Sequence, residues 1–383
     1  MVRSRGIVTV TESGLAKEKE VTIGFVGPLT GGAAFIGVDA LNGVLLAAED
    51  INAEGGIVVN GEKYTIKIES YDDEATPAKA VAGFRRLHDR YEIPVVICNL
   101  SGSSIAITEI NQRMGVLWTG FATHPDITAK GNKLVLRAYP ASAPTTAYAV
   151  EGVVEVLKSK NFVILSDASD YGRTQETQFR TQLEAKGVKY LATEWFDQRK
   201  DSDFRVLITK IKRLNPDAVV ICAYDEATGQ IIKQMREMGL MAPSVTSTGF
   251  QTKGIQIAGW KNLEGGFGVT GPTGFDPPPQ SLRNYREKYK KAYPKGIPAS
   301  YGENNYELVI AVARGMEKAG SVSDPHKIKQ GMMAAVPVEK KYRTAWIEKW
   351  EENGEVTVWQ RGILFKGGKR LDKYGKELAP PEY

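Results

Sequence analysis

Apolar residues in the first part of the chain change from an alternating to a helical spacing. They alternate over 21–25, which is typical of a strand, and the glycine-rich stretch 27–37 then predicts a loop. Over 41–51 they recur at the spacing of one helical stripe, and Gly55 and Gly56 end that helix. A strand, a loop and a helix in this order predict the opening unit of a parallel α/β sheet, in which ligands bind at the carboxyl ends of the strands.

The alternation of strand and helix continues in two series, which are separated by a crossing near Pro140. The first series ends with a strand over 116–119, and the second extends from a helix at 143–158 to a strand at 245–248. A stretch rich in glycine and proline, 271–279, then leads back to further helices. This order predicts an α/β fold of two similar lobes, each with a parallel central sheet flanked by helices.

Length, composition and charge narrow the class of protein. The chain has 383 residues, of which 42% are hydrophobic and 25% are charged, and this length favours two domains. A formal net charge of +5, without a Lys/Arg cluster that alternates with exposed aromatic residues, argues against binding to nucleic acid. No apolar run is long enough to span a bilayer, and the polar segment 1–20 lacks the apolar centre of a signal peptide. We therefore expect either a cytoplasmic protein or an exported one whose signal is absent from this sequence.

The two cysteines occupy similar positions in the two series. Cys98 and Cys222 each end a VVIC sequence at the end of a predicted strand. This equivalence places them in different halves of the protein, so it predicts two buried free thiols rather than a disulfide.

Motifs for the common enzyme chemistries are missing from the sequence. The glycines after the first strand do not fit G-x-G-x-x-G, and neither G-x-x-x-x-G-K-[ST] nor G-x-S-x-G occurs. The three histidines, His88, His124 and His326, share no metal-ligand spacing. We therefore expect a binding protein that uses neither a metal nor a cofactor, rather than an enzyme.

Polar and aromatic residues gather at the predicted strand ends, where a ligand would bind. The first series contributes Phe35, the loop 121–123 and the turn at 100–104, which precedes a helix predicted over 105–114. Hydroxyl and backbone N–H groups at a helix start form a natural carboxylate site, and Ser103 and Ser104 have that arrangement. Simple N-capping by these serines remains the alternative. The second series contributes these strand-end residues: Asp170, Tyr171, Tyr224, Asp225, Glu226, Phe250 and Gln251.

Six ordered segments resemble the leucine/isoleucine/valine-binding protein family, the type I periplasmic binding proteins that serve ABC importers. These segments are GFVGPLTGGAAFIG, LNGVLLAAEDINAEGG, DDEATPAKAV, FATHPDIT, DYGRTQ and NPDAVVICAYDEATGQIIKQMREMGL. The similarity extends from about residue 21 to about residue 335. It implies two α/β lobes that are joined by a hinge of three crossings and hold the ligand between them.

The resemblance also implies how the chain divides. After a polar N-terminal segment, 1–20, lobe 1 would comprise 21–137 and 275–338, and lobe 2 would comprise 138–274 and 339–383. The similarity does not extend well to the N-terminal segment or to the tail beyond Arg343.

Matching positions imply the ligand-binding residues. The ligand's α-carboxylate would be held by Ser101, Gly102, Ser103, Ser104, Phe121, Ala122 and Thr123. Phe35 would line the pocket, and Tyr171 and Tyr224 would close over the ligand from lobe 2. Family members that bind amino acids often have an acidic residue, paired with the ligand's ammonium, where the neutral Gln251 stands here. Asp170, Asp225 or Glu226 would then have to replace that acid, or else the ligand lacks an amine, as an aromatic or keto acid does.

The implied function is that of an extracytoplasmic solute-binding protein of an ABC importer, located in the periplasm or at the cell surface. A small amino acid or related carboxylate would bind between the lobes, which close on it, and the closed monomer would dock on a membrane permease. The alternative is a ligand-sensing regulator or receptor on the same fold, for an amide, an aromatic acid or a keto acid.

Overall fold

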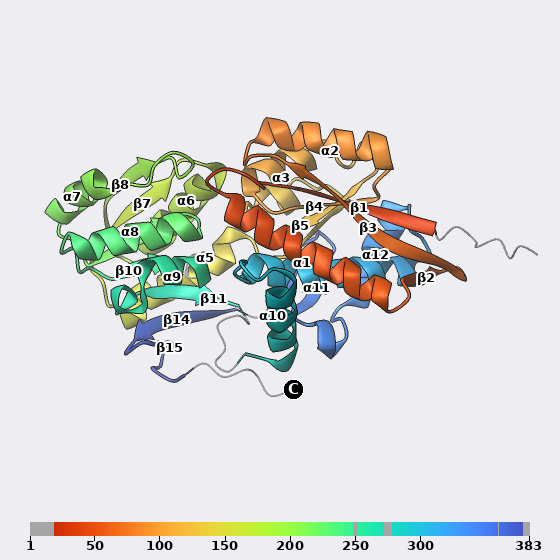
Figure 1. The fold of residues 1–383 in the computed structure, drawn as a ribbon. Coiled ribbons are helices and arrows are strands. Elements are labelled where there is room, and N and C mark those ends of the chain that lie inside the picture. The colour runs from red at the N-terminus through yellow and green to blue at the C-terminus, as the bar shows by residue number, and fades with distance from the viewer. Residues whose placement is uncertain (1–18, 248–251, 272–277, 359, 378–383) are drawn as a thin grey trace, which may run out of the picture.

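A computed structural model describes residues 19–247, 252–271, 278–358 and 360–377, which form two lobes (Figure 1). Each lobe is built on a sheet with helices on both faces. The N-terminal segment 1–18 lies outside the described residues. The two-lobed α/β fold expected from the sequence is therefore confirmed.

Among the described residues, the sheet of lobe 1 has six strands in the order β2-β3-β1-β4-β5-β6, all parallel except for β2 with β3. Its strands are β1 Lys19–Gly27, β2 Ile57–Val59, β3 Glu62–Asp72, β4 Val95–Cys98, β5 Leu117–Gly120 and β6 Val135–Arg137. Its helices are α1 Ala34–Ala53, α2 Pro77–Tyr91, α3 Ser101–Thr108, α4 Asp126–Ala129, α10 Gln280–Ala292, α11 Ser300–Ala319 and α12 Pro325–Ala335.

Side chains of the central strands are buried on both faces of this sheet. Phe25 of β1 packs into the core that includes α1 and α11, whereas the next residue, Val26, packs with α2. In β4, Ile97 likewise packs into the core that includes α1 and α11, and Cys98 packs with α2. Continuous apolar runs such as VVIC arise because a parallel strand covered on both faces has no solvent side.

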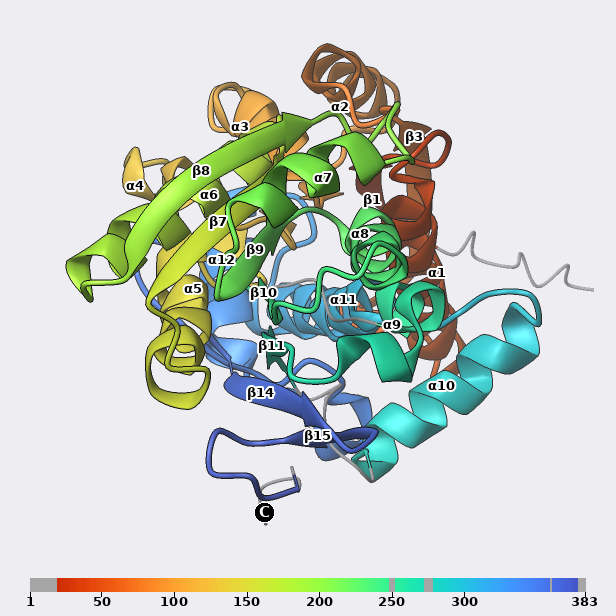
Figure 2. The same cartoon turned by 90° about the vertical axis from the view of Figure 1, so that its left-hand side faces the viewer.

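The sheet of lobe 2, as far as it is described, has seven strands in the order β15-β14-β11-β10-β9-β7-β8 (Figure 2). Strands β7 to β11 pair in parallel, and β14 and β15 add an antiparallel edge. The strands are β7 Asn161–Asp167, β8 Lys189–Phe196, β9 Ala218–Cys222, β10 Ser244–Thr246, β11 Phe267–Thr270, β14 Arg361–Lys366 and β15 Lys369–Leu371. The helices are α5 Ser142–Glu151, which continues as a π-helical turn Gly152–Val156, α6 Asp170–Ala185, α7 Arg205–Arg213, α8 Asp225–Glu237, α9 Thr252–Ala258 and a 3-10 turn Trp260–Leu263.

Three crossings join the lobes, as the fold class predicts. The chain passes from β6 to α5 at 138–141, then from β11 to α10, and finally back to β14. Residues that follow β1, β3, β4 and β5 in lobe 1, and β7, β8 and β9 in lobe 2, line the spaces between the lobes. The carboxyl ends of these parallel strands therefore face that region.

The tail divides between the two lobes. The hairpin of β12 Ile347–Trp350 and β13 Val356–Val358 packs on the core of lobe 1, whereas β14 and β15 extend the sheet of lobe 2. The buried carboxylate of Glu307 in α11 fixes the entry to this hairpin by accepting the backbone N–H groups of Thr344 to Ile347 at 2.7–2.9 Å. The sequence-based bounds put all of 339–383 in lobe 2. We propose instead that 340–358 belongs to lobe 1.

Two local features bear on the site. Helix α3 begins at Ser101, four residues before the predicted start, so the serines lie in its first turn. Cys98 and Cys222 are free and buried, at equivalent ends of β4 and β9, as the sequence predicts. Burial raises the pKa of the Cys98 thiol to about 12, and it raises the pKa of Cys222 as well.

Candidate ligand-binding site

Three adjoining spaces lie between the lobes, and Tyr224 lines all of them. The innermost, which we call the inner cavity, has a volume of about 20 Å³, enough for one water-sized group. Lobe 1 provides most of its wall, and lobe 2 provides two tyrosines. The lining residues are Ile36, Asn99, Leu100, Ser101, Phe121, Ala122, Thr123, Tyr171, Tyr224 and Tyr301.

The predicted serines differ in where their hydroxyls point. Ser101 lines the inner cavity, and its hydroxyl makes no hydrogen bond to the residues that the structure describes. Ser103 donates to Oδ2 of the buried Asp73 at 2.6 Å, and Ser104 donates to the Cys98 carbonyl at 3.2 Å. Among these three hydroxyls, only that of Ser101 can donate to a ligand without first giving up a bond within the protein.

The backbone of α3 adds further donors. The first three N–H groups of a helix have no acceptor within it, and those of Ser101, Gly102 and Ser103 find none elsewhere in the described chain. Gly102 and Ser103 line the space beside the inner cavity. Partial positive charge at this helix end therefore faces the region between the lobes.

Thr123 is the second donor group of lobe 1. Its side chain is only 3% exposed, lines the inner cavity, and has no partner for Oγ1 among the described residues. The neighbouring backbone is tightly held, because Phe121 N–H donates to Asn99 Oδ1 at 2.8 Å and the Thr123 carbonyl accepts from Ser142 N–H at 2.8 Å. A buried hydroxyl without a partner is uncommon and marks a place where a ligand atom can bind.

The sequence did not single out Asn99 and Tyr301, which also line this cavity. Asn99 directly follows β4, and its buried Nδ2 has no partner among the described residues. Tyr301 lies in the first turn of α11, and its ring meets that of Phe121 edge-on at 5.1 Å between centroids. The position of Asn99 directly after a buried strand was a usable signal. Tyr301 reaches the site only through the return of the chain to lobe 1, which no local pattern shows.

The lobe 2 wall consists of two stacked tyrosine rings. Tyr171 lies in the first turn of α6, and Tyr224 immediately precedes α8. Their ring centroids are 4.9 Å apart, and their planes are inclined by 24°. Gln198 fixes Tyr224 by accepting its backbone N–H at 2.9 Å. Burial raises the pKa of Tyr224 well above the usual value, so its hydroxyl remains protonated.

The acidic groups of lobe 2 lie around this wall. The carboxylate of Asp167 is already bonded to Ser169 N–H and to the backbone and side chain of Gln198. Asp170 lies opposite Gly102, where an added Cβ would be 2.8 Å from its Oδ2. Asp225 is buried at the start of α8, and its charge adds to the effect of burial in raising the pKa of Tyr301.

Of the predicted site residues, Phe35 lies at the edge of the site and Gln251 cannot be placed. Phe35 lines the outer space between the lobes, where the ammonium of Lys253 from lobe 2 lies 5.9 Å from its ring centroid. Gln251 is outside the described residues.

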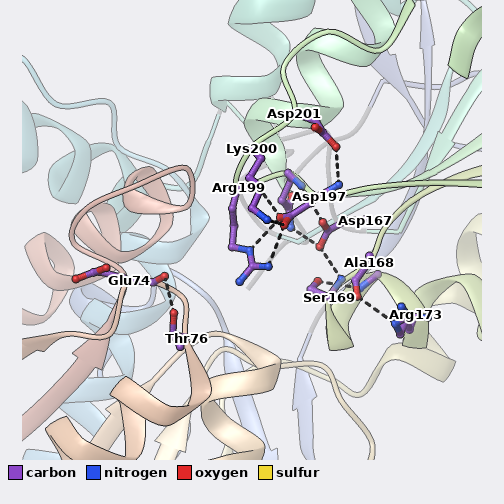
Figure 3. Close-up of polar contacts among 12 residues, drawn as sticks. Glu74, Thr76, Asp167, Ala168, Ser169, Arg173, Asp197, Arg199, Lys200 and Asp201 are labelled. Atoms are coloured by element: carbon purple, nitrogen blue, oxygen red, sulfur yellow. Dashed lines mark hydrogen bonds and ion pairs between the residues drawn. The ribbon is translucent and has the colours of Figure 1, made fainter. Parts of the chain in front are cut away.

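A polar loop of lobe 2, residues 197–201, borders the same outer space. Arg199 donates to Asp197 through Nε and Nη2 at 2.9 and 3.0 Å, and Asp201 accepts the Asp197 N–H (Figure 3). The loop closely approaches Gly32 of lobe 1, where an added Cβ would be 3.1 Å from the Gln198 carbonyl oxygen. The two lobes are therefore in contact around the cavities.

Within the described residues, no group of His, Cys, Asp and Glu side chains is arranged to hold a metal ion. In the same part of the chain, no helix is long and apolar enough to cross a membrane.

Known proteins of one class are similar to this chain over most of its length. The family model for periplasmic binding proteins matches residues 20–355. A leucine-, isoleucine-, valine-, threonine- and alanine-binding protein of Pseudomonas aeruginosa is 32% identical over 320 residues and covers 82% of each chain. An amino acid binding protein of the same organism is 30% identical over 343 residues and covers 88% of each chain.

Solved structures show the same fold. The substrate-binding protein of a branched-chain amino acid transporter from Streptococcus pneumoniae, in complex with isoleucine, superposes with a TM-score of 0.79 at 24% identity, over 92% of this chain and 98% of that one. A solute-binding protein from R. palustris in complex with benzoate gives a TM-score of 0.78 at 19% identity, over 94% and 98%. At these identities the likeness shows the fold alone. The sequence matches over most of the chain, however, show that this protein belongs to the periplasmic binding proteins, as a member of the leucine/isoleucine/valine-binding protein family.

Proposed function

We propose that this solute-binding protein holds an α-amino acid between its lobes, with the ligand's carboxylate in the inner cavity. The unpartnered Thr123 hydroxyl is the observation that carries the proposal. Ser101 lines the same cavity with a free hydroxyl, and the N–H groups of the first turn of α3 add positive potential. A carboxylate would supply acceptors to all these donors at once, and such charge-assisted bonds are short and strong.

The rest of the ligand would meet lobe 2. The stacked rings of Tyr171 and Tyr224 offer a flat apolar surface, and the buried carboxylate of Asp225 borders the adjoining space, where it could neutralise an ammonium group. The relatives named for leucine, isoleucine, valine, threonine and alanine support an amino acid. A small carboxylate without an amine, such as the benzoate held by a structural neighbour, is the competing ligand class.

Closure of the lobes on the ligand would present a form that docks on the membrane permease of an ABC importer. In this proposal the protein acts outside the cytoplasm, as its family does, and works as a monomer. It binds its ligand without a metal or a cofactor, does not change it chemically, and has no nucleic-acid partner.

Calorimetry with the purified protein tests the ligand class. The panel contains L-leucine, L-isoleucine, L-valine, L-threonine and L-alanine, together with 4-methyl-2-oxopentanoate and benzoate as carboxylates that lack an amine. We expect binding of at least one amino acid and recovery of that ligand unchanged by mass spectrometry. Binding of the keto acid or benzoate alone would reject an amino acid as the ligand, and turnover of any bound compound would reject the receptor role.

A further inference from the structure

The side chain of Arg137 is the largest buried cation next to the site, and none of the roles above uses it. It ends β6 directly before the first crossing, and it is fully buried. Nη1 donates to the Ala122 carbonyl at 2.7 Å, and Nη2 donates to the His124 carbonyl at 2.8 Å. These two carbonyls are on either side of Thr123, which lines the inner cavity and whose hydroxyl has no partner among the described residues.

Peptide geometry links these bonds to the ligand. The carbonyl of one residue and the N–H of the next lie on opposite sides of a planar trans peptide. When Arg137 holds the Ala122 carbonyl, the Thr123 N–H must therefore point the other way, and it has no acceptor among the described residues. Ala122 and Thr123, on either side of this peptide, both line the inner cavity.

The same loop is attached to the other end of the crossing. The Thr123 carbonyl accepts from the N–H of Ser142, the first residue of α5. Arg137 and Ser142 lie at the two ends of the crossing at 138–141. Both ends of the crossing are therefore hydrogen-bonded to the loop that contains Thr123. A rotation of the lobes about this crossing would move the attachment points of Thr123.

The tail hairpin holds Arg137 in turn. Arg137 N–H donates to the Gly354 carbonyl at 2.8 Å, and its own carbonyl accepts from the indole Nε1 of Trp350. Glu355 pairs with the guanidinium at 3.3 Å. Burial lowers the pKa of Arg137 to about 10, with Glu355 acting against this, so the side chain stays charged at neutral pH. Nη2 also donates to the Thr128 hydroxyl at 3.1 Å, so the guanidinium is held by one carboxylate and three further oxygen acceptors.

We propose that Arg137 is a positioning residue, which aims the N–H and hydroxyl of Thr123 at the ligand's carboxylate and joins that loop to the hinge. This role rests on the proposed binding of a carboxylate in the inner cavity. The proposal also gives the β12–β13 hairpin a function, because the hairpin holds Arg137, which orients the loop around Thr123.

The test compares Arg137→Lys with a matched variant, Arg236→Lys. Arg236 also donates to backbone carbonyls, those of Leu240, Ala242 and Asn262, but it lies at the end of α8 away from the cavity. A lysine at 137 keeps the positive charge beside Glu355 and loses the fork that holds two carbonyls at once. The readouts are the Kd of the amino acid that wild type binds best and amide hydrogen exchange in the ligand-free protein.

We expect Arg137→Lys to weaken binding by roughly tenfold or more, the effect of losing one oriented bond to a charged group. Amides of Phe121, Thr128 and Ser142 should exchange faster in this variant, and Arg236→Lys should change neither readout. Unchanged affinity, or unchanged exchange over 121–129, would overturn the positioning role.

Two further outcomes of the experiment need a separate reading. If Arg137→Lys does not fold, Glu355→Gln removes the ion pair while leaving the arginine, and it should shift both readouts in the same direction by a smaller factor. If wild type binds no compound of the panel, the proposed function fails, and the exchange data on the ligand-free variants still decide whether Arg137 orders the loop.

Discussion

The hydroxyl of Ser103 lies 2.6 Å from Oδ2 of Asp73 and donates to it. Burial raises the pKa of Asp73, and the bonds from Ser103 and from Ala75 N–H act against that shift. The bond fixes the first turn of α3 to the end of β3. It also removes Ser103 from the hydroxyl donors that a ligand can use, which separates structural from ligand-facing serines within four consecutive residues.

Replacing the serines one at a time should show this separation. Ser101→Ala removes a hydroxyl without a partner, so we expect a roughly tenfold weaker Kd and an unchanged melting temperature of the ligand-free protein. Ser104→Ala breaks a buried bond to Cys98 and should lower stability by about 1 kcal/mol with little change in Kd. Calorimetry and thermal unfolding measure the two quantities. A loss of stability in Ser101→Ala together with a loss of affinity in Ser104→Ala would contradict the orientation of these side chains.

Thr123→Val should weaken binding without destabilising the protein. Valine keeps the shape of threonine but has no hydroxyl, so the variant removes an unpartnered buried polar group and should be at least as stable as wild type. Its Kd should rise by roughly tenfold or more. The control is Thr119→Val, which breaks a 2.6 Å bond to the Leu136 carbonyl and should lower stability instead. Equal affinity of Thr123→Val and wild type would remove the main support for the carboxylate site.

A larger side chain at Gly32 should obstruct closure. An added Cβ would lie 3.1 Å from the Gln198 carbonyl oxygen and 3.3 Å from the Arg199 Cα, so lobe 2 would have to move back. We expect Gly32→Val to weaken ligand binding more than Gly32→Ala does, and to enlarge the radius of gyration of the ligand-saturated protein in X-ray scattering. A ligand-saturated Gly32→Val protein with the wild-type radius would show that this contact does not limit closure.

The Asp197 carboxylate should make stability depend on pH in the acid range. The hydrogen bonds from Arg199 lower its pKa to about 2, against the opposing effect of burial. A lowered folded-state pKa gives stability that is present above the unfolded value of about 4 and is lost as the pH falls toward about 2. Because the Arg199 side chain is 54% exposed, we expect a contribution of only about 1 kcal/mol. Urea unfolding at several pH values should show a shallower acid loss for Asp197→Asn than for wild type, and equal slopes would contradict the assignment.

The sequence predicted the lobes and their strands because periodicity reports burial. The VVIC runs that end at Cys98 and Cys222 were predicted to be strands with buried thiols at their ends, and the structure confirms them as buried strands inside the two sheets. It did not predict that the tail would divide, since Trp350 and the chain around it bind lobe 1 through Glu307 and Arg137, contacts that no local pattern contains.

The candidate site was predicted to a similar extent. Strand-end position brought Ser101, Thr123, Tyr171 and Tyr224 to one cavity, because parallel strands end at the same edge. Position alone did not show which serine hydroxyls are already bonded. That depends on Asp73 and on the Cys98 carbonyl, which lie in other elements. The role of Gln251 remains a prediction, as this residue lies outside the described part of the chain.

The two buried cysteines make the protein suitable for conversion into an optical sensor. A thiol whose pKa is raised to about 12, as for Cys98, holds almost no thiolate at neutral pH, and the thiolate is the species that maleimide dyes attack. Cysteines introduced at exposed sites, one on each lobe, would therefore carry the dyes selectively in the native background. The protein could report its own opening and closing by energy transfer without removal of either natural thiol.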